Sequence, residues 1–586
     1  MSDGCRLYYD GRNPSHEIAM AVGIILFASI LACAPMLWYG ASNGTDSSTA
    51  LVWVRYFSQQ LLDGNLYPRW LMNANRGAGS PAFYFYAPLP YYIASIATFL
   101  FPKAALTTQL AWEDWLLLSL SGVSFFVYGR TRFRSGVAVV CSILYMLLPY
   151  HYEIDLWTRQ DLGELTNYIW MPLALRFAEE LMRNGTGEAG FAGCFALMLI
   201  SHIPSTLLFT LCLVPYAVMQ YRRKEFFAKL LKSVRALCVG VLLAAVYWVP
   251  AYFSQQYIHA EAWWTWYLDY HIWFFPVRPL EAFRSMPDGR AYNLRIFTLV
   301  GITTVAMMLL ALASVLAHGV SYIKKLAAYI AMASFAWFLM TPASELVWTT
   351  LPFLAKVQFP SRVSMVVDLA TAVIALHAVS GLRPTKRSAV VIIAGVAASL
   401  IWCIWTADLK AKLGPFSDQS LIALRDEYVN EGVDAPEYTT IWSPFSGDTF
   451  DNSAHIGPRA RVSYDVQNGM VDIGRWEPGR IELAVDLKTA TSLIVKQFYF
   501  PSWRAMTEDG IPMPISPSKQ DGLISLNLPS GDYRLIVKLV PLPQEVVGAL
   551  MSLVGIGMLV GVSKQVKGVS KWLKKRDTRR DDSPAT

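Results

Sequence analysis

The chain has 586 residues, of which 54% are apolar and 16% are charged. Soluble domains carry about 25% charged residues, so this composition excludes a soluble enzyme. The apolar residues form blocks of about 20, the length of helix that crosses a hydrocarbon core of roughly 30 Å. Much of the net charge of +7 lies in the tail 563–580, which is typical of a cytoplasmic anchor rather than a nucleic-acid site. The composition predicts a polytopic α-helical membrane protein without a nucleic-acid partner.

Twelve apolar runs are predicted to cross the membrane, with both chain ends in the cytoplasm. The run 84–101 is also long enough, but it contains Pro88 and Pro90 and many tyrosines. We expect it to form an interfacial or re-entrant helix, because only then do the basic clusters of later loops face the cytoplasm. The same rule divides 188–220 into two spans. The expected spans are residues 18–39, 109–128, 136–150, 163–182, 188–202, 204–220, 236–254, 294–317, 326–342, 363–382, 388–407 and 544–562.

This topology divides the chain into three regions. Residues 1–408 form a transmembrane module, residues 409–543 an extracytoplasmic β-rich domain, and residues 544–586 the final transmembrane helix with a basic cytoplasmic tail. Long ordered loops usually carry function, so we expect the chemistry on the outer face. The outer loops of the module are residues 40–108, 151–162, 255–293 and 343–362.

The region 409–543 differs from the rest of the chain in its apolar pattern. Apolar and polar residues alternate with a period of two, as in residues 480–485 and 523–528, and turn pairs such as Asp509-Gly510 separate the runs. This pattern predicts an antiparallel, β-sandwich-like domain.

The sequence offers no evident cluster of metal ligands. Of the seven cysteines, Cys5 lies in the N-terminal tail and the others lie inside apolar runs, and no CxxC or Cys/His arrangement occurs. Neither a disulfide framework nor a zinc site is predicted. A divalent cation is left open, without a ligand cluster to support it.

Asp46 follows the first span by a few residues, at the level of a lipid headgroup. Spacing alone favours an N-cap for a helix over 48–62, because Asp before Ser-Ser-Thr commonly starts a helix. A catalytic carboxylate is the alternative.

Arginines in two outer loops lie among aromatic residues and glycines. Arg69 and Arg76 precede Tyr84 and Tyr86, a combination that suits bidentate binding of an anionic headgroup. An aromatic belt with snorkelling arginines explains the same pattern. Arg362, close to Gln358, has the same two interpretations. These residues alone do not decide between them.

The short outer loop 151–162 and its surroundings concentrate ionisable residues beside two apolar spans. Because such groups are costly at this depth unless paired or functional, we expect Arg159 to form an ion pair or a polar substrate site with nearby acids. Those acids are Asp155, Asp161 and Glu164. Glu113 and Asp114 fit a solvated rim as well as a site, and a histidine at a span end, such as His202, is more often interfacial than a ligand.

Together, and in this order, these residues resemble the GT-C superfamily of integral-membrane glycosyltransferases. The resemblance covers most of the chain and is closest to bacterial branches with a C-terminal extracytoplasmic β-domain. Relatives usually carry a histidine or second acid near the first-loop aspartate, whereas Asp46 is followed by Ser47, Ser48 and Thr49, which argues against a metal-assisted reaction. The matching segments, besides Asp46, are Gly-Asn-Leu-Tyr-Pro-Arg-Trp (64–70), Gly-Ser-Pro-Ala-Phe-Tyr-Phe-Tyr-Ala-Pro-Leu-Pro-Tyr-Tyr (79–92), Arg-Gln-Asp-Leu-Gly-Glu (159–164), Ser-His (201–202), Val-Gln-Phe-Pro-Ser-Arg (357–362) and Phe-Tyr-Phe-Pro-Ser-Trp-Arg-Ala (498–505).

The resemblance implies an inverting glycosyltransferase of the bacterial cytoplasmic (inner) membrane. It would move a sugar from a polyprenyl-phosphate donor to a glycan, lipid or protein acceptor on the extracytoplasmic face. Asp46 would be the general base, and no metal is implied. The donor phosphate would be held by Arg69, Arg76, Arg159 and Arg362. Acceptor contacts and supporting roles would fall to Asp155, Asp161, Glu164, Tyr84, Tyr86, His202 and Gln358.

Two functions of other classes stay open. A transporter or flippase of lipid-linked glycans would need charged or polar residues through the bundle centre, where Asp368 and His377 are the visible examples. A non-catalytic envelope assembly protein would be built around the β-domain.

Overall fold

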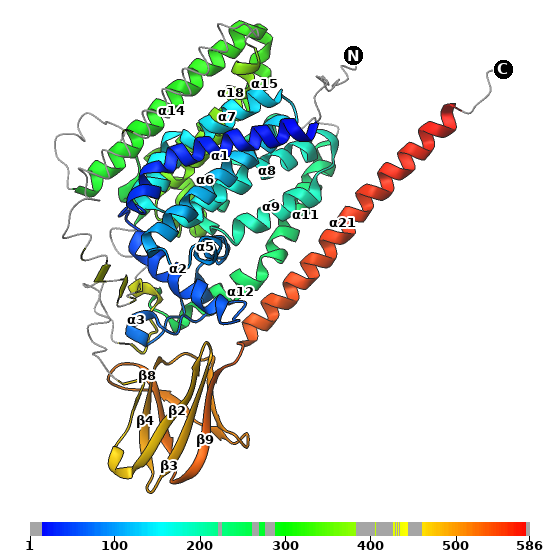
Figure 1. The fold of residues 1–586 in the computed structure, drawn as a ribbon. Helices are drawn as coiled ribbons and strands as arrows, with labels where there is room; N and C mark the ends of the chain where they lie inside the picture. Colours follow the sequence, from blue (N-terminus) through cyan, green and yellow to red (C-terminus); the bar gives the residue numbers. More distant parts are fainter. Residues whose placement is uncertain are drawn as a thin grey trace.

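The structure is a computed structural model in which residues 14–220, 225–260, 269–275, 288–381, 434–443 and 460–581, with isolated residues between 405 and 432, are described. Figure 1 shows a bundle of long helices with a β-domain at one end of it. The last helix begins beside the β-domain and runs along the bundle. The expected span 388–407, except for residue 405, and much of the loop 255–293 lie outside the described residues.

The first half of the bundle contains the helices that carry the outer loops. They are α1 (Pro14–Tyr39), α2 (Ser47–Leu62), α3 (Ala74–Gly77), α4 (Ala82–Phe85), α5 (Leu89–Leu100), α6 (Leu106–Arg130), α7 (Ser135–Leu147), the π-helix η1 (Tyr150–Arg159) and α8 (Leu162–Asn184).

The second half continues with further helices and short 3-10 turns. The helices are α9 (Glu188–Leu199), α10 (Ile203–Gln220), α11 (Phe226–Leu243), α12 (Ala245–Phe253), α14 (Asp288–His318), α15 (Ile323–Leu339), α16 (Glu345–Thr350), α17 (Pro352–Ala355), α18 (Ser364–Ser380) and α21 (Pro543–Asp581). The 3-10 turns are η3 (Gln255–Tyr257), η6 (Tyr270–Trp273), η7 (Val320–Tyr322), η8 (Pro342–Ser344), η9 (Pro360–Val363), η11 (Pro436–Tyr438) and η13 (Val466–Asn468).

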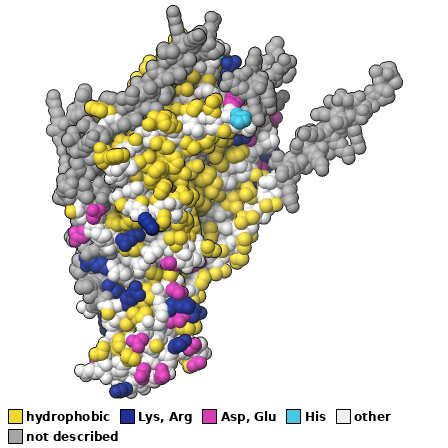
Figure 2. Space-filling view, in the orientation of Figure 1, with side chains coloured by type: hydrophobic (Ala, Val, Ile, Leu, Met, Phe, Trp, Pro, Cys, Tyr) yellow, Lys and Arg dark blue, Asp and Glu magenta, His cyan; other side chains and the backbone are white. Residues whose placement is uncertain are grey.

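Several helices are long and apolar enough to cross a membrane. Among the described residues there are seven, or up to nine if each of two bent helix pairs counts as one span. Figure 2 shows a broad hydrophobic face over the helices, while charged side chains gather over and near the β-domain. Apolar side chains such as Leu550 and Leu553 of α21 are more than half exposed, which suits contact with lipid. The chain is therefore a polytopic membrane protein with a C-terminal β-domain.

The structure refines the expected spans at three places. The run 84–101 contains α5, whose 12 residues reach only about 18 Å, so it does not cross a hydrocarbon core as one helix. The run 188–220 is divided into α9 and α10, as the charge pattern predicted. The expected loop 151–162 is instead mostly the π-helix η1, which continues α7 after a break at Pro149.

The β-domain consists of two antiparallel sheets, with strand orders β1-β4-β8-β7 and β2-β3-β9-β5-β6. The predicted alternation is confirmed, because Ile481, Leu483 and Val485 of one sheet are buried while their neighbours along the strand are more exposed. The strands are β1 (Val462–Ser463), β2 (Gly469–Glu477), β3 (Arg480–Leu487), β4 (Thr491–Phe498), β5 (Trp503–Thr507), β6 (Pro512–Met513), β7 (Ile515–Pro517), β8 (Leu523–Leu528) and β9 (Gly531–Leu539).

One glutamine fixes the β-domain to the outer loop that follows α2. The Gln497 side-chain oxygen accepts a hydrogen bond from Trp70 Nε1 at 2.7 Å, and its Nε2 donates to the carbonyls of Met72 and Gly77 at 3.1 and 2.8 Å. The backbone N–H of Phe498 donates to the carbonyl of Ala78 at 2.6 Å. These contacts place the β-domain against the loop that leads back to Asp46.

Candidate active site

The site begins at the end of the π-helix η1. Leu148 is extended before Pro149, as expected for a residue that precedes proline, and this interrupts α7 before η1. Gln160 then adopts a left-handed conformation with φ 60°, and Asp161 caps α8 by accepting a hydrogen bond from the N–H of Glu164 at 3.0 Å. This geometry turns Arg159 and Asp161 toward the same point.

Arg159 contacts three acids close to it in the sequence and a fourth, Asp46, from the first outer loop. Its Nη1 donates to Glu164 Oε1 at 2.7 Å and lies 3.4 Å from Asp155 Oδ1, while its Nη2 donates to Asp161 Oδ2 at 2.6 Å. The same Nη2 lies 4.0 Å from Asp46 Oδ2. The ion pair predicted for this loop is therefore confirmed as a network centred on one guanidinium group.

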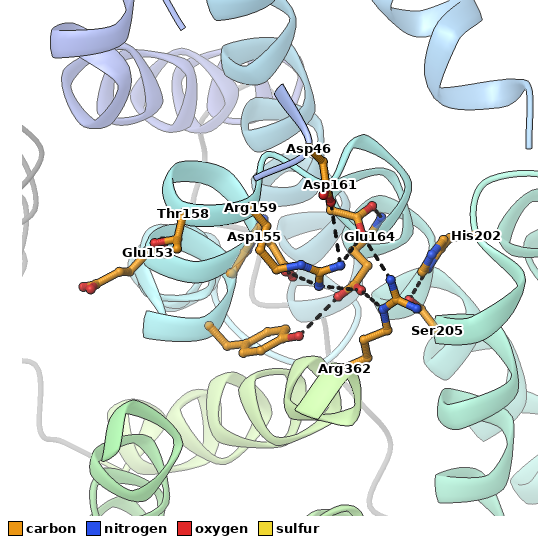
Figure 3. Close-up of polar contacts among 12 residues, drawn as sticks. Asp46, Glu153, Asp155, Thr158, Arg159, Asp161, Glu164, His202, Ser205 and Arg362 are labelled. Carbon is orange, nitrogen blue, oxygen red and sulfur yellow. Dashed lines mark hydrogen bonds and ion pairs between the residues drawn. The ribbon is translucent and has the colours of Figure 1, made fainter. Parts of the chain in front are cut away.

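Arg362 reaches the same acids from η9. Its Nε lies 2.7 Å from Glu164 Oε1, its Nη2 lies 3.9 Å from Asp161 Oδ2, and its Nη1 donates to the carbonyl of Val357 at 2.7 Å. Figure 3 shows the two arginine side chains converging on Asp161 and Glu164. The aromatic ring of Phe359 lies within 6.0 Å of both guanidinium groups. We call Asp46, Asp155, Arg159, Asp161, Glu164 and Arg362 the acid–arginine cluster.

The cluster is buried except for Asp46. Glu164 and Asp155 have no exposed surface, whereas half of the Asp46 side chain is exposed. Four carboxylates face two guanidinium groups, so the fully ionised cluster carries an excess of negative charge. Burial acts to raise the pKa of Asp161, but the charges of Arg159 and of neighbouring cations hold it below its ordinary value. Asp161 is therefore ionised at neutral pH.

Asp46 occupies the N-cap position of α2 but does not use it. Its side chain makes no capping hydrogen bond. The backbone N–H groups of Thr45 and Asp46 donate to the carbonyls of Thr158 and Arg159 at 3.1 and 3.0 Å, which attaches this loop to the end of η1. A Cβ at Gly44 would lie 2.8 Å from the Arg159 carbonyl oxygen, so only glycine permits this approach. The capping role favoured by spacing is thus not the one that the side chain takes.

His202 lies beside the cluster and is buried. Its Nδ1 is 2.5 Å from Ser205 Oγ, and burial lowers its pKa to about 3, so the ring is neutral. His202, Asp161 and Glu164 bring ligand atoms within 4.8 Å of one another, which is a geometry that could hold a divalent cation. The carboxylate oxygens already contact Arg159 and Arg362, so a cation would have to displace two guanidinium groups. The residues therefore fit a metal poorly, although a cluster that the sequence did not reveal is present.

Other residues predicted for the site lie elsewhere. Arg69 contacts Glu545 and the ring of Tyr67 near the β-domain, and the hydroxyl of Tyr84 donates to Ser502 of the same junction. Arg76 lines a different cavity, of about 460 Å³, together with Arg461 and Lys496. The predicted four-arginine clamp is therefore divided, and only Arg159 and Arg362 share a site.

Tyr86 and Gln358 lie closer to the cluster. The ring of Tyr86 packs edge-on against Trp53 at 4.6 Å, beside Tyr438 from the segment that precedes the β-domain. Gln358 has a left-handed backbone with φ 68° immediately before Phe359. This conformation turns the chain from α17 into η9 and so helps to position Arg362.

Sequence reasoning misjudged two acids on α6. Glu113 and Asp114 have no exposed surface, so neither lies on a solvated rim. Asp114 accepts a hydrogen bond from Gln160 Nε2 at 2.6 Å, directly behind the cluster, whereas both carboxylate oxygens of Glu113 lack a hydrogen-bond partner among the described residues. The signal available from the sequence was the position of both acids inside an apolar helix.

No protein-family model matches the chain, and no curated protein of similar sequence is found. Among solved structures, a cryo-EM structure of the arabinofuranosyltransferase AftD from Mycobacteria is similar, with 14% identity and a TM-score of 0.38 over 70% of this chain and 27% of that chain. A mutant form of AftD gives 14% identity and a TM-score of 0.37 over 68% of this chain and 28% of that one. The chain thus spans little more than a quarter of AftD, and a similarity of this extent identifies neither a family nor an activity.

Proposed function

We propose that the protein is an inverting glycosyltransferase of the GT-C type. It would move a sugar from a polyprenyl-phosphate donor to a glycan, lipid or protein acceptor on the extracytoplasmic face of a bacterial inner membrane. The observation that carries the proposal is Asp46, a half-exposed carboxylate that does not cap its helix and lies 4.0 Å from a buried arginine. The order of motifs that resembles the GT-C superfamily and the apolar helices of the bundle support it.

In the proposed reaction, Asp46 accepts the proton of an acceptor hydroxyl. The hydroxyl oxygen forms a bond to the anomeric carbon of the donor sugar while the bond from that carbon to the phosphate oxygen breaks on the opposite face. The electron pair leaves with the polyprenyl phosphate, and the configuration of the sugar inverts. One carboxylate base is sufficient for this chemistry, because a phosphate whose charge is stabilised leaves without protonation.

Arg159 and Arg362 are the residues we propose for the donor phosphate. Both guanidinium groups point into the cluster, and planar guanidinium groups bind phosphate oxygens in pairs. The surrounding acids fix these groups before the donor arrives. Glu164 and Asp161 therefore act by orienting the arginines, and Asp155 contributes a weaker contact to Arg159.

The test is a transfer assay with the purified protein in nanodiscs and a radiolabelled polyprenyl-phosphate sugar. Transfer to an acceptor, or slow hydrolysis of the donor, supports the transferase. Movement of the intact lipid across the bilayer without bond cleavage would instead establish the flippase alternative. If the donor is neither cleaved nor moved, the non-catalytic envelope assembly role is the remaining alternative.

A further inference from the structure

A second cavity lies between the transmembrane module and the β-domain. We call it the junction cleft. Its walls are the loop after α2, the turn between β2 and β3, and the connection from β9 to α21. Its volume of about 730 Å³ is within the range of about 300–1,000 Å³ that small-molecule sites occupy. Figure 1 shows this region where α2 and α12 approach the β-domain.

The junction cleft is remote from the acid–arginine cluster. Helix α2 has Asp46 at its N-cap and Asp63 at its C-cap, and Asp63 lines the cleft. Asp63 lies 17 positions after Asp46, which corresponds to about 25 Å along a helix. A ligand in the cleft is therefore bound at a separate place from the proposed transfer reaction.

Aromatic rings form much of the wall. Tyr67 and Trp476 are half-buried and line the cleft, and the guanidinium carbon of Arg69 lies 4.1 Å from the centre of the Tyr67 ring. Tyr84 and Trp70 are buried behind them, held by hydrogen bonds to Ser502 and Gln497. Aromatic side chains held rigidly at a cavity wall offer flat apolar faces to a ligand ring at little cost in conformational entropy.

Three buried polar atoms of the wall have no hydrogen-bond partner among the residues that the structure describes. They are the hydroxyl oxygen of Tyr67, Nη1 of Arg69 and Oε1 of Glu545. The remaining nitrogens of Arg69 are engaged, since Nη2 donates to the carbonyl of Val246 at 2.9 Å and Nε lies 3.8 Å from Glu545 Oε1. Buried polar atoms are almost always paired in native proteins, so such orphans call for a polar ligand.

The charged groups of the cleft favour a neutral or cationic ligand over an anionic one. Its described lining contains three carboxylates, of Asp63, Glu477 and Glu545, and one cation, Arg69. The cleft thus offers one guanidinium group, whereas the acid–arginine cluster offers the two that we propose for the donor phosphate, and this argues against the donor headgroup as its ligand. Carboxylates accept strong hydrogen bonds from hydroxyl groups, and Arg69 and Tyr67 donate to ring or hydroxyl oxygens. The combination of flat apolar faces with these groups matches a saccharide.

We propose that the junction cleft is a saccharide-binding site for a neutral or amino-sugar segment of a glycan. A ring of the glycan stacks on Trp476, while its hydroxyls pair with Arg69, the Tyr67 hydroxyl and the acids of the rim. Saccharide binding at this place does not depend on the proposed enzyme activity. Its identification as the distal part of the acceptor rests on that proposed function.

The experiment presents the full-length protein in nanodiscs to an array of neutral, amino and acidic oligosaccharides. Wild-type protein should bind neutral or amino oligosaccharides and not acidic ones. Trp476→Ala should weaken this binding at least tenfold, and Tyr67→Phe, which removes only the orphan hydroxyl, about two- to tenfold, the effect of one hydrogen bond. Tyr533→Phe is the matched control, because its exposed hydroxyl contacts the carbonyl of Pro529 outside the cleft.

Three results would overturn the proposal: no saccharide binding by the wild type, preferential binding of acidic glycans, or unchanged binding in both cleft variants. Circular dichroism of Trp476→Ala checks that β2 is intact. If this variant is misfolded, Tyr67→Phe alone still tests the cleft. Asp46→Asn should bind the array as the wild type does. Array binding without any donor turnover would refute the proposed transferase alone, and turnover without array binding would refute the cleft alone.

Discussion

The two ends of α8 each bury an ion cluster, and the clusters are built differently. At the N-terminal end, Glu164 belongs to the acid–arginine cluster with its excess of acids and its half-exposed Asp46. At the other end, about 22 Å along the helix, Glu179 has no exposed surface and forms an ion pair with Arg132. Glu179 Oε1 also accepts hydrogen bonds from three tyrosine hydroxyls. These are Tyr128 at 3.1 Å, Tyr216 at 3.0 Å and Tyr329 at 2.6 Å.

The difference separates a structural cluster from the one that we propose as reactive. The Glu179 cluster joins α8 to α10, α15 and the end of α6, balances one acid against one base, and leaves no carboxylate open to a ligand. The acid–arginine cluster keeps more carboxylates than cations and presents one of them to solvent. Burial of charge alone therefore does not indicate a site, whereas an unbalanced cluster with an accessible member does.

The largest expected effect is on turnover. Asp46→Asn keeps the volume of the side chain but cannot accept a proton, so we expect turnover to fall about 10²- to 10⁴-fold with unchanged thermal stability. Glu179→Gln should leave turnover per folded molecule within a few-fold of the wild type. Steady-state assays with the radiolabelled donor measure both. The matched control is Asp472→Asn, an exposed aspartate of β2. Near-normal turnover of Asp46→Asn would move the base to Asp155, Asp161 or Glu164.

The second expected effect is on stability, and it concerns the Glu179 cluster rather than the acid–arginine cluster. Glu179→Gln leaves the Arg132 charge without its partner, so we expect a loss of about 3 kcal/mol in unfolding free energy, at the lower end for a broken buried pair because Arg132 is partly exposed. Thermal unfolding in nanodiscs, compared with the exposed-site variant Glu508→Gln, measures the loss. An unfolding temperature equal to that of the wild type would show that the tyrosines alone hold these helices together.

The third prediction concerns the pH dependence of stability that arises from Asp434, a buried carboxylate outside both clusters. Asp434 is buried where the segment before the β-domain meets α2, accepts hydrogen bonds from Trp53, Ser80 and its neighbour's N–H, and has a pKa raised by burial to about 6. Because the folded state binds the proton more tightly than the unfolded state, this group stabilises the fold most below about pH 4. This stabilisation, of up to about 3 kcal/mol, is lost as pH rises through about 6.

Asp434→Asn cannot titrate, so its unfolding temperature relative to the wild type should rise between pH 4 and pH 7. Thermal unfolding of both proteins at matched pH values measures this difference. A difference that stays constant across the range would contradict the raised pKa of Asp434.

The smallest expected effect is on donor binding, and it tests whether Arg362 of the acid–arginine cluster binds the donor phosphate. Arg362→Ala should weaken donor binding by about 1.5–3 kcal/mol, the range for a charge-assisted hydrogen bond, and Arg362→Lys should recover only part of it because the planar fork is lost. Equilibrium binding of the labelled donor measures both, with Arg534→Ala of β9, an exposed arginine, as control. Equal affinities for wild type and Arg362→Ala would remove Arg362 from the phosphate site. Arg159 is less suitable for this test, because its removal would leave several buried acids unpaired.

Local patterns in the sequence predicted much of the fold. Period-two alternation located β3 and β8, and the positive-inside rule correctly divided α9 from α10. The π-helix η1 was not predicted, because its side chains are as polar as those of a loop and only tertiary pairing buries them. Arg159, Asp161 and Glu164 lie within six positions of one another, so their pairing could be predicted from the chain alone.

The site could not be predicted in full, because it depends on contacts between residues that are far apart in the sequence. Asp46 and Arg362 reach the cluster across more than 100 and about 200 residues of chain, and no spacing rule encodes such contacts. Arg69 and Arg76 share a motif-rich loop with Asp46, yet helix α2 carries that loop about 25 Å away. The predicted clamp therefore included two arginines that are close to Asp46 in the sequence but distant from it in the structure.

The attachment of the β-domain has a consequence for how this protein can change during evolution. Gln497 uses its amide as acceptor and donor at once, toward Trp70 and toward two backbone carbonyls, and no other side chain of that length offers both roles. A Cβ at Gly79 would lie 2.5 Å from Trp70 Nε1 and 2.6 Å from Gln497 Oε1. Trp70, Gly79 and Gln497 should accordingly be inherited as one unit among homologues, retained or lost together, while the exposed strand edges of the same domain diverge freely.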